Sequence, residues 1–160
     1  MSTVNVSLKV NGKAYEVQVE PRTLLIDLLR NHIKIKSVHR GCEEGECGAC
    51  TVLLNGKPIL SCITLAAQAS GSDLLTVEGL TTDAKMNSLM DAFAEHYAIQ
   101  CGYCTPGMLL TAYHLLNTVS DPSEEEIRKG ISGNLCRCTG YVNIVKAIQT
   151  AFQTQKEKLR

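Results

Sequence analysis

The sequence is poor in aromatic residues and carries no excess of charge. It has 0 Trp and 2 Phe among 160 residues, so aliphatic side chains must fill the core. Its 16 Lys and Arg residues balance 16 Asp and Glu residues. Because a neutral chain has no electrostatic reason to bind nucleic acid or an anionic membrane surface, we expect neither as a partner.

Long hydrophobic runs are also absent. No stretch approaches the roughly 20 apolar residues of a transmembrane helix. Residues 1–10 contain no apolar run of the length found in signal peptides. These absences predict a cytoplasmic protein without a membrane span. Disulfides rarely persist in the cytoplasm, so clustered cysteines there usually bind metal or react.

Cysteine, by contrast, is abundant, with 8 residues in two spaced sets. The first set has the spacing C-x4-C-x2-C-x11-C and comprises Cys42, Cys47, Cys50 and Cys62. This spacing is typical of a plant-type 2Fe–2S cluster, whereas zinc usually takes two C-x2-C pairs. Gly41, Gly45 and Gly48 allow the tight turns that bring backbone N–H groups to the sulfur atoms. We therefore predict a 2Fe–2S cluster at this set.

The second set comprises Cys101, Cys104, Cys136 and Cys138. Each of its two pairs stands at or just before the start of a predicted helix, where free N–H groups and the helix dipole favour an anionic cluster. The spacing itself leaves open a second cluster, a four-cysteine zinc site or a redox dithiol. A redox dithiol would be more usual in a thioredoxin-like βαβ context, which the sequence lacks.

The first half of the chain predicts a small sheet with one helix. Residues 4–10 and 13–19 alternate apolar and polar side chains around Asn11-Gly12, a strong signal for a two-residue hairpin loop. Such a loop sets Val10 opposite Lys13. The other predicted elements are a helix with Thr23 as N-cap and Leu24, Leu25, Leu28 and Leu29 as its apolar stripe, a hairpin of residues 51–54 and 57–60, and a strand at 74–77.

The second half predicts helices after a polar linker at residues 78–85. The predicted helices lie near residues 87–96, from Thr105-Pro106 to 116, from the Ser123–Glu126 capping box to 131, and from 139–140 to 152. We expect an α+β fold with a boundary near residue 78. Residues 1–78 would form a β-grasp, plant-type ferredoxin-like domain and residues 79–160 a four-helix domain.

Three motifs contain every cysteine except Cys62: GCEEGECGACTV at residues 41–52, QCGYCTPGM at 100–108 and GNLCRCTGY at 133–141. Together they resemble the iron–sulfur subunit of the molybdenum hydroxylases, the xanthine oxidase family. The resemblance spans roughly residues 4 to 152 and includes every cysteine. It implies a 2Fe–2S cluster in each domain and two partner chains, a large molybdopterin subunit and a medium FAD subunit, in a dimer of heterotrimers.

The resemblance also implies roles for four residues. Gln100 and Cys138 would lie against the pterin, and Gly45 and Glu46 would face the flavin. Electrons would pass from molybdenum to the helical-domain cluster, then to the plant-type cluster, then to flavin. Without the resemblance, Gln100 is simply a surface glutamine at a helix end.

The chain itself has no visible place for substrate chemistry. It has no G-x-G-x-x-G motif after a strand and no room for a flavin or molybdenum domain. We therefore expect a relay subunit, not catalytic alone, in an enzyme that oxidises a purine, an N-heteroaromatic compound, an aldehyde or a similar substrate. Glu43-Glu44-Gly45 stands where the carbon monoxide dehydrogenase branch has Asp-Thr-Ser, which disfavours that branch. A free-standing two-cluster ferredoxin and a structural zinc protein are the other interpretations.

A docking face is also expected on the helical half. Leu109, Leu110, Leu115 and Leu116 look exposed in the sequence and would meet the molybdenum subunit. The alternative, which we expect to hold for most of them, is that these leucines fill the core of the helical bundle.

Overall fold

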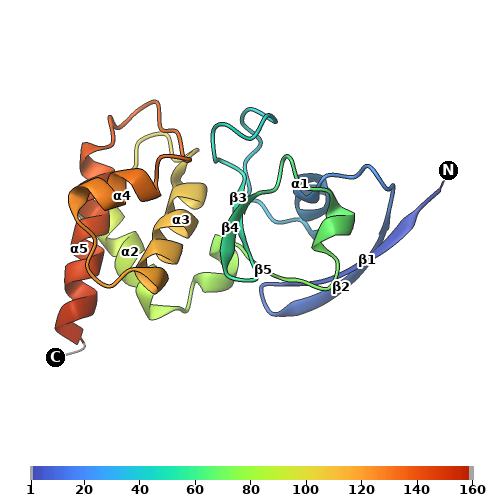
Figure 1. Ribbon diagram of the computed structural model, residues 1–160, viewed down its shortest axis with the longest axis horizontal. Coiled ribbons are helices and arrows are strands. Elements are labelled where there is room, and N and C mark those ends of the chain that lie inside the picture. The colour runs from blue at the N-terminus through green and yellow to red at the C-terminus, as the bar shows by residue number, and fades with distance from the viewer. Residues whose placement is uncertain (1, 159–160) are drawn as a thin grey trace.

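The computed structural model describes residues 2–158, which form a sheet-containing part and a helical part side by side (Figure 1). The sheet part contains β1 (Val4–Val10), β2 (Lys13–Val19), α1 (Leu25–Asp27), the π-helical stretch η1 (Leu28–Ile33), β3 (Thr51–Leu54), β4 (Lys57–Leu60), the short helix η2 (Ala66–Ala69) and β5 (Asp73–Leu75). The short helix η3 (Val77–Leu80) leads to α2 (Ala84–Glu95), α3 (Thr105–Thr118), α4 (Glu124–Gly130) and α5 (Val142–Lys158).

The five strands form one mixed sheet in the order β2-β1-β5-β3-β4. The first hairpin has the predicted register, with Val10 opposite Lys13 and Val4 opposite Val19. The second hairpin pairs β3 with β4 as predicted, and β5 runs parallel to β1 between them. This sheet with its short helices, followed by a helical bundle, confirms the predicted α+β fold of a ferredoxin-like part and a helical part.

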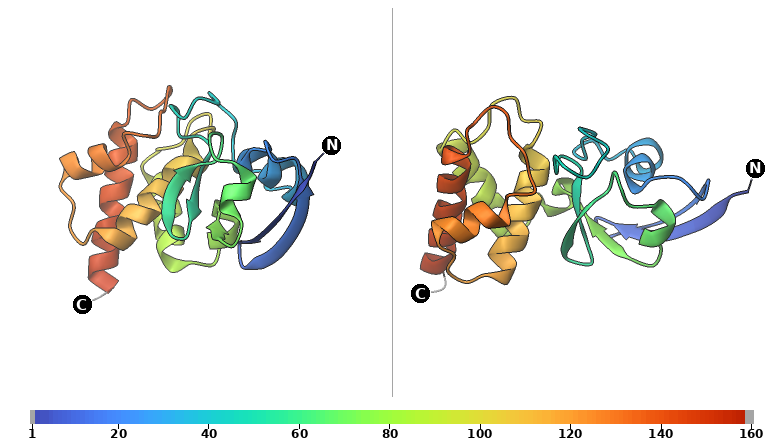
Figure 2. Two further views of the ribbon diagram at one scale, coloured as in Figure 1. Left: turned by 45° about the vertical axis from the view of Figure 1, so that its right-hand side comes forward. Right: turned by 45° about the horizontal axis from the view of Figure 1, so that its top comes forward.

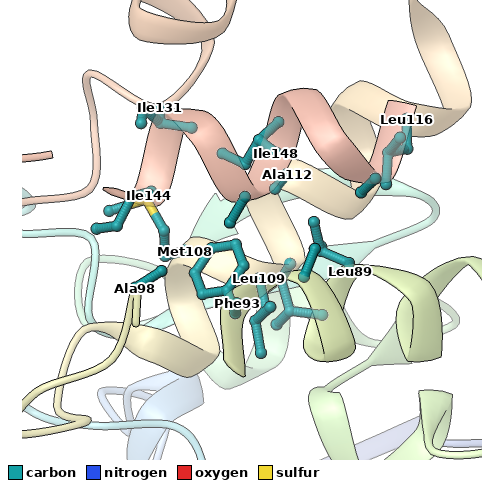
Figure 3. Close-up of a cluster of buried hydrophobic side chains, with 14 of the residues drawn as sticks. Leu89, Phe93, Ala98, Met108, Leu109, Ala112, Leu116, Ile131, Ile144 and Ile148 are labelled. Carbon is teal, nitrogen blue, oxygen red and sulfur yellow. The ribbon is translucent and has the colours of Figure 1, made fainter. Parts of the chain in front are cut away.

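Each part has its own cluster of buried hydrophobic side chains. In the helical part, side chains of α2, α3 and α5 point into a common core that includes Phe93, Met108 and Ile148 (Figure 3). The predicted boundary near residue 78 falls within η3 and stays a prediction.

The leucines of α3 fill the core of the helical bundle, as expected for most of them, and do not form a docking face. Leu109, Leu110 and Leu116 are at most 5% exposed, and Leu115 packs half-buried against the same core. The alternative interpretation, that these side chains fill the bundle, therefore describes them.

The predicted cap at Thr23 is wrong. The N-cap of α1 is Leu24, and no side chain caps the helix. The Thr23 carbonyl instead accepts a hydrogen bond from Ala66 N–H at 2.8 Å, and Leu24 forms a β-bridge with Leu65. Because this ladder holds the chain extended up to residue 24, the helix starts later and continues as the π-helical stretch.

Other predicted boundaries shift by a few residues. The helix α2 begins at Ala84, three residues before the expected start, because Asp83 accepts hydrogen bonds from the N–H groups of Lys85 and Met86. At α3, Cys104 is the N-cap, so Thr105 is the first helical residue. Among residues 2–158 no helix has both the length and the apolar character needed to cross a bilayer.

Candidate metal centres

Three members of the first cysteine set, Cys42, Cys47 and Cys50, stand on the loop between η1 and β3, and Cys62 follows β4. The loop curls around one sulfur atom. The Sγ atom of Cys42 accepts hydrogen bonds from the backbone N–H groups of Glu44 at 3.5 Å, Glu46 at 3.4 Å and Cys47 at 3.4 Å. The turns that aim these groups inward need positive φ angles, as at Gly45 with φ +82°. Hydrogen bonds from Glu44, Cys47 and Glu46 lower the pKa of Cys42 to about 6, which favours the thiolate form that binds iron.

The other three members of this set lie close by. The side chains of Cys47 and Cys42 are neighbours, as are those of Cys50 and Cys62, and in each pair one thiol shifts the pKa of the other. Cys50 and Cys62 are buried, and burial together with Cys50 raises the pKa of Cys62 to about 11. A Cβ atom on Gly41 would lie 2.7 Å from the Cys47 Sγ atom, so a larger residue at position 41 would displace that sulfur.

The second cysteine set stands on two loops of the helical part, one between α2 and α3 and one between α4 and α5. The side chains of Cys104 and Cys136 are neighbours, as are those of Cys101 and Cys138, and in each pair one thiol shifts the pKa of the other. Burial and the neighbouring Cys136 raise the pKa of Cys104 to about 12. Burial also acts to raise the pKa of Cys136, but hydrogen bonds from Thr139, whose hydroxyl donates at 3.2 Å, lower it overall. The loops that carry both sets emerge on the same side of the molecule (Figures 1 and 2).

The chemistry of both donor sets fits binuclear clusters. Each set supplies four cysteines, the number of thiolates that holds the two irons of a 2Fe–2S cluster. The backbone N–H groups directed at the Cys42 sulfur atom also suit an anionic cluster.

The two sets are joined by backbone and side-chain hydrogen bonds. Leu135 N–H donates to the Cys47 carbonyl at 2.9 Å, and Asn134 Nδ2 donates to the Gly48 carbonyl at 3.0 Å. Leu135 directly precedes Cys136 of the second set, and Cys47 belongs to the first set. A single hydrogen bond therefore links the backbone of the two sets next to Cys136.

A second contact joins the sheet part and the helical part, between residues 39–40 and Tyr103. The rings of His39 and Tyr103 stack with their centroids 4.6 Å apart. Tyr103 OH donates to the Arg40 carbonyl at 2.6 Å, and His39 Nδ1 lies 2.8 Å from the Tyr103 carbonyl. These residues stand just before Cys42 and Cys104, so each cysteine loop is held at two places.

Comparison with known proteins decides the family. Residues 5–95 match a family described as a 2Fe-2S iron–sulfur cluster binding domain, and residues 76–149 match a [2Fe-2S] binding domain. The nicotinate dehydrogenase small FeS subunit of Eubacterium barkeri is 49% identical over 153 residues, which cover 96% of this chain and 98% of that protein. This chain belongs to the iron–sulfur subunits of the molybdenum hydroxylases, the xanthine oxidase family.

Further relatives agree in sequence and in structure. The caffeine dehydrogenase subunit gamma of Pseudomonas sp. (strain CBB1) is 48% identical over 96% of this chain and 94% of its own length. A chain of quinoline 2-oxidoreductase from Pseudomonas putida 86 superposes with a TM-score of 0.91 at 45% identity, with 98% of each chain covered. The aldehyde oxidoreductase of Desulfovibrio gigas superposes with a TM-score of 0.87 at 36% identity, and the match covers 97% of this chain and 17% of that longer one. The predicted iron–sulfur, electron-transfer role is thereby confirmed.

In this family member, the residues expected to meet partner cofactors lie at the surface. Gln100 and Cys138 are exposed beside the second set, and Glu46 is exposed at the first. Gly45 packs against the Ile63 side chain, so that a Cβ atom added to Gly45 would lie 2.9 Å from the Ile63 Cδ1 atom. Large exposed hydrophobic residues also gather in sequence around the second set, namely Tyr97, Ile99, Tyr103, Leu135 and Val142.

Sequence reasoning missed the residues that join the two sets. Asn134 lies inside the GNLCRCTGY motif, but its burial and its contact with the other half are invisible in the sequence. His39 and Tyr103 likewise carry no pattern that would pair them. The only available signal was position, since each stands within three residues of a cysteine.

Proposed function

We propose that this chain holds a plant-type 2Fe–2S cluster on one half and a second 2Fe–2S cluster on the other. The ligands are Cys42, Cys47, Cys50 and Cys62 for the first, and Cys101, Cys104, Cys136 and Cys138 for the second. Each cluster, when bound, accepts and releases electrons at a potential tuned by hydrogen bonds and exposure. The chain thereby relays electrons between two other subunits of the enzyme.

The hydrogen-bonded junction between the two cysteine sets is the observation that carries this proposal. It runs from the Cys47 carbonyl to Leu135 N–H at 2.9 Å, next to Cys136. A protein with two independent structural metal sites would not need its ligand loops to touch. A relay does, because its carriers must stay at a short, fixed separation.

The two ends of the relay meet different partners. Gln100 and Cys138, which are exposed at the second set, would lie against the pterin of a large molybdopterin subunit. Gly45 and Glu46, at the first set, would face the flavin of a medium FAD subunit. Tyr97 and Ile99, exposed hydrophobic residues that closely precede Gln100 in the chain, would supply apolar contacts to such a partner.

The whole enzyme would be a cytoplasmic dimer of heterotrimers. Its substrate is chosen in the large subunit rather than in this chain. Relatives named for nicotinate, caffeine and nicotine support an N-heteroaromatic substrate over an aldehyde or carbon monoxide.

The test is Cys101→Ser in the assembled enzyme. We expect the EPR signal of one reduced cluster to disappear, the other to remain, and turnover to stop while flavin stays bound. The matched variant Cys42→Ser should remove the other signal and also stop turnover. Normal turnover in either variant would end the relay proposal. Purification of the native chain as a stable monomer, with no flavin or molybdenum companion, would instead indicate a free-standing ferredoxin.

A further inference from the structure

We propose that Asn134 is a positioning residue that fixes the separation and relative orientation of the two cysteine sets. The inference rests on the proposed relay, because the separation matters only if electrons pass between the sets. Within residues 2–158, the Asn134 side chain bonds Thr111, Gly48 and Thr51 rather than a cysteine sulfur, so it acts through the chain that carries the two cysteine sets.

The Asn134 side chain is buried and uses both ends of its amide. It is 3% exposed. Its Oδ1 atom accepts from the Thr111 hydroxyl at 2.7 Å, within the helical part. Its Nδ2 group donates to the Gly48 carbonyl at 3.0 Å and to Thr51 Oγ1 at 3.2 Å, both in the sheet part. One side chain thus bonds both halves of the molecule.

The backbones around this amide approach as closely as glycine allows. A Cβ atom on Gly48 would overlap the Gly133 carbonyl oxygen and would lie 2.6 Å from Asn134 Nδ2. A Cβ atom on Gly107 would overlap the Gly48 carbonyl oxygen. The backbones at Gly48, Gly107 and Gly133 therefore approach each other closely around the Asn134 amide. This close packing leaves the amide little room for another arrangement.

This contact lies on the route between the two sets. Asn134 directly precedes Leu135, whose N–H bonds the Cys47 carbonyl at 2.9 Å, and Gly48 directly follows Cys47. The amide therefore holds the residues on either side of that hydrogen bond. Without it, a buried carbonyl and two buried hydroxyls lose a partner, and the two cysteine sets are held together less firmly.

The experiment compares variants of the purified complex by EPR of the fully reduced clusters and by the rate of flavin reduction. In Asn134→Ala we expect both cluster signals to remain and flavin reduction to slow several-fold. The EPR splitting caused by magnetic coupling between the two reduced clusters should decrease, or its lines should broaden. Thr111→Val keeps the side-chain shape but removes the hydroxyl that orients Asn134, so we expect the same changes to a smaller extent. If Asn134→Ala does not fold, Thr111→Val decides the question by the same readouts.

Thr76→Val is the matched control. Thr76 is 0% exposed, and its hydroxyl bonds Asn11 and Glu78 rather than Asn134, Gly48 or Thr51. We expect this variant to lose stability but to keep the inter-cluster splitting and the rate. Unchanged splitting and rate in a folded Asn134→Ala variant with both clusters would overturn the inference. Absence of two cluster signals in the unmodified complex would instead overturn the proposed function.

Discussion

At the scale of single residues, glycine at position 48 is required by contact as well as by conformation. Its φ is +68°, and a Cβ atom there would overlap the Gly133 carbonyl oxygen. Gly56 also has a positive φ, of +78°, but nothing lies within 4 Å of the place where its Cβ would be. Substitution of Gly56 therefore measures the cost of backbone strain alone, whereas substitution of Gly48 adds the cost of steric overlap.

We predict that Gly48→Ala destabilises the protein far more than Gly56→Ala. Both variants carry a backbone cost of about 1–2 kcal/mol for an L-residue with positive φ. Gly48→Ala adds about 1–3 kcal/mol of overpacking, because backbone must move to admit the methyl group. Urea midpoints followed by cluster absorbance measure both variants. Equal midpoints would mean that the halves do not meet closely at residue 48.

The residues of the site differ in how far the sequence predicts them. The cysteines are visible because their spacing reports a chemical requirement, namely several thiolates around one small object. Asn134 is not visible, because a buried amide that bridges two halves has the same local sequence as an exposed turn residue. Its role depends on contacts with Gly48 and Thr51, more than 80 residues away in the chain.

At the scale of elements, local signals predict structure well where they act alone. The Asn11-Gly12 turn fixed the register of its hairpin, because turn geometry and alternating pattern agree. The Thr23 cap failed because a neighbouring segment, at Leu65 and Ala66, bonds the same stretch of backbone. Tertiary pairing of this kind leaves no trace in a local sequence pattern.

The capping box of α4 is an element-scale prediction that the structure makes testable. The Ser123 hydroxyl accepts from Glu126 N–H at 3.2 Å, and the Glu126 carboxylate accepts from Ser123 N–H at 2.7 Å. We predict that Ser123→Ala lowers stability by about 1 kcal/mol, the usual loss for an N-cap serine. The control is Ser88→Ala inside α2, where alanine is the better helix former and stability should hold or rise slightly. Urea midpoints compare the two, and an equal effect would argue against the cap.

At the scale of the whole molecule, the surfaces beside the two cysteine sets should bind different subunits. Val142 is 51% exposed at the start of α5, near the second set, and Ile63 is 57% exposed beside Gly45. We predict that Val142→Asp weakens binding of the large subunit while the fold is kept, because an acidic residue suits a helix N-terminus. Ile63→Asp should instead weaken binding of the medium subunit. Subunit ratios after purification test this crossed design, and loss of the same subunit from both variants would contradict it.

The central claim is that both cysteine sets hold 2Fe–2S clusters, and metal analysis of the purified chain tests it most directly. The account predicts about four irons and about four acid-labile sulfides per chain, with two distinct EPR signals on reduction. Serine variants of Cys50 and Cys104 should each remove half of the iron and one signal. Zinc in place of iron, or iron at only half this content in the intact protein, would contradict the account.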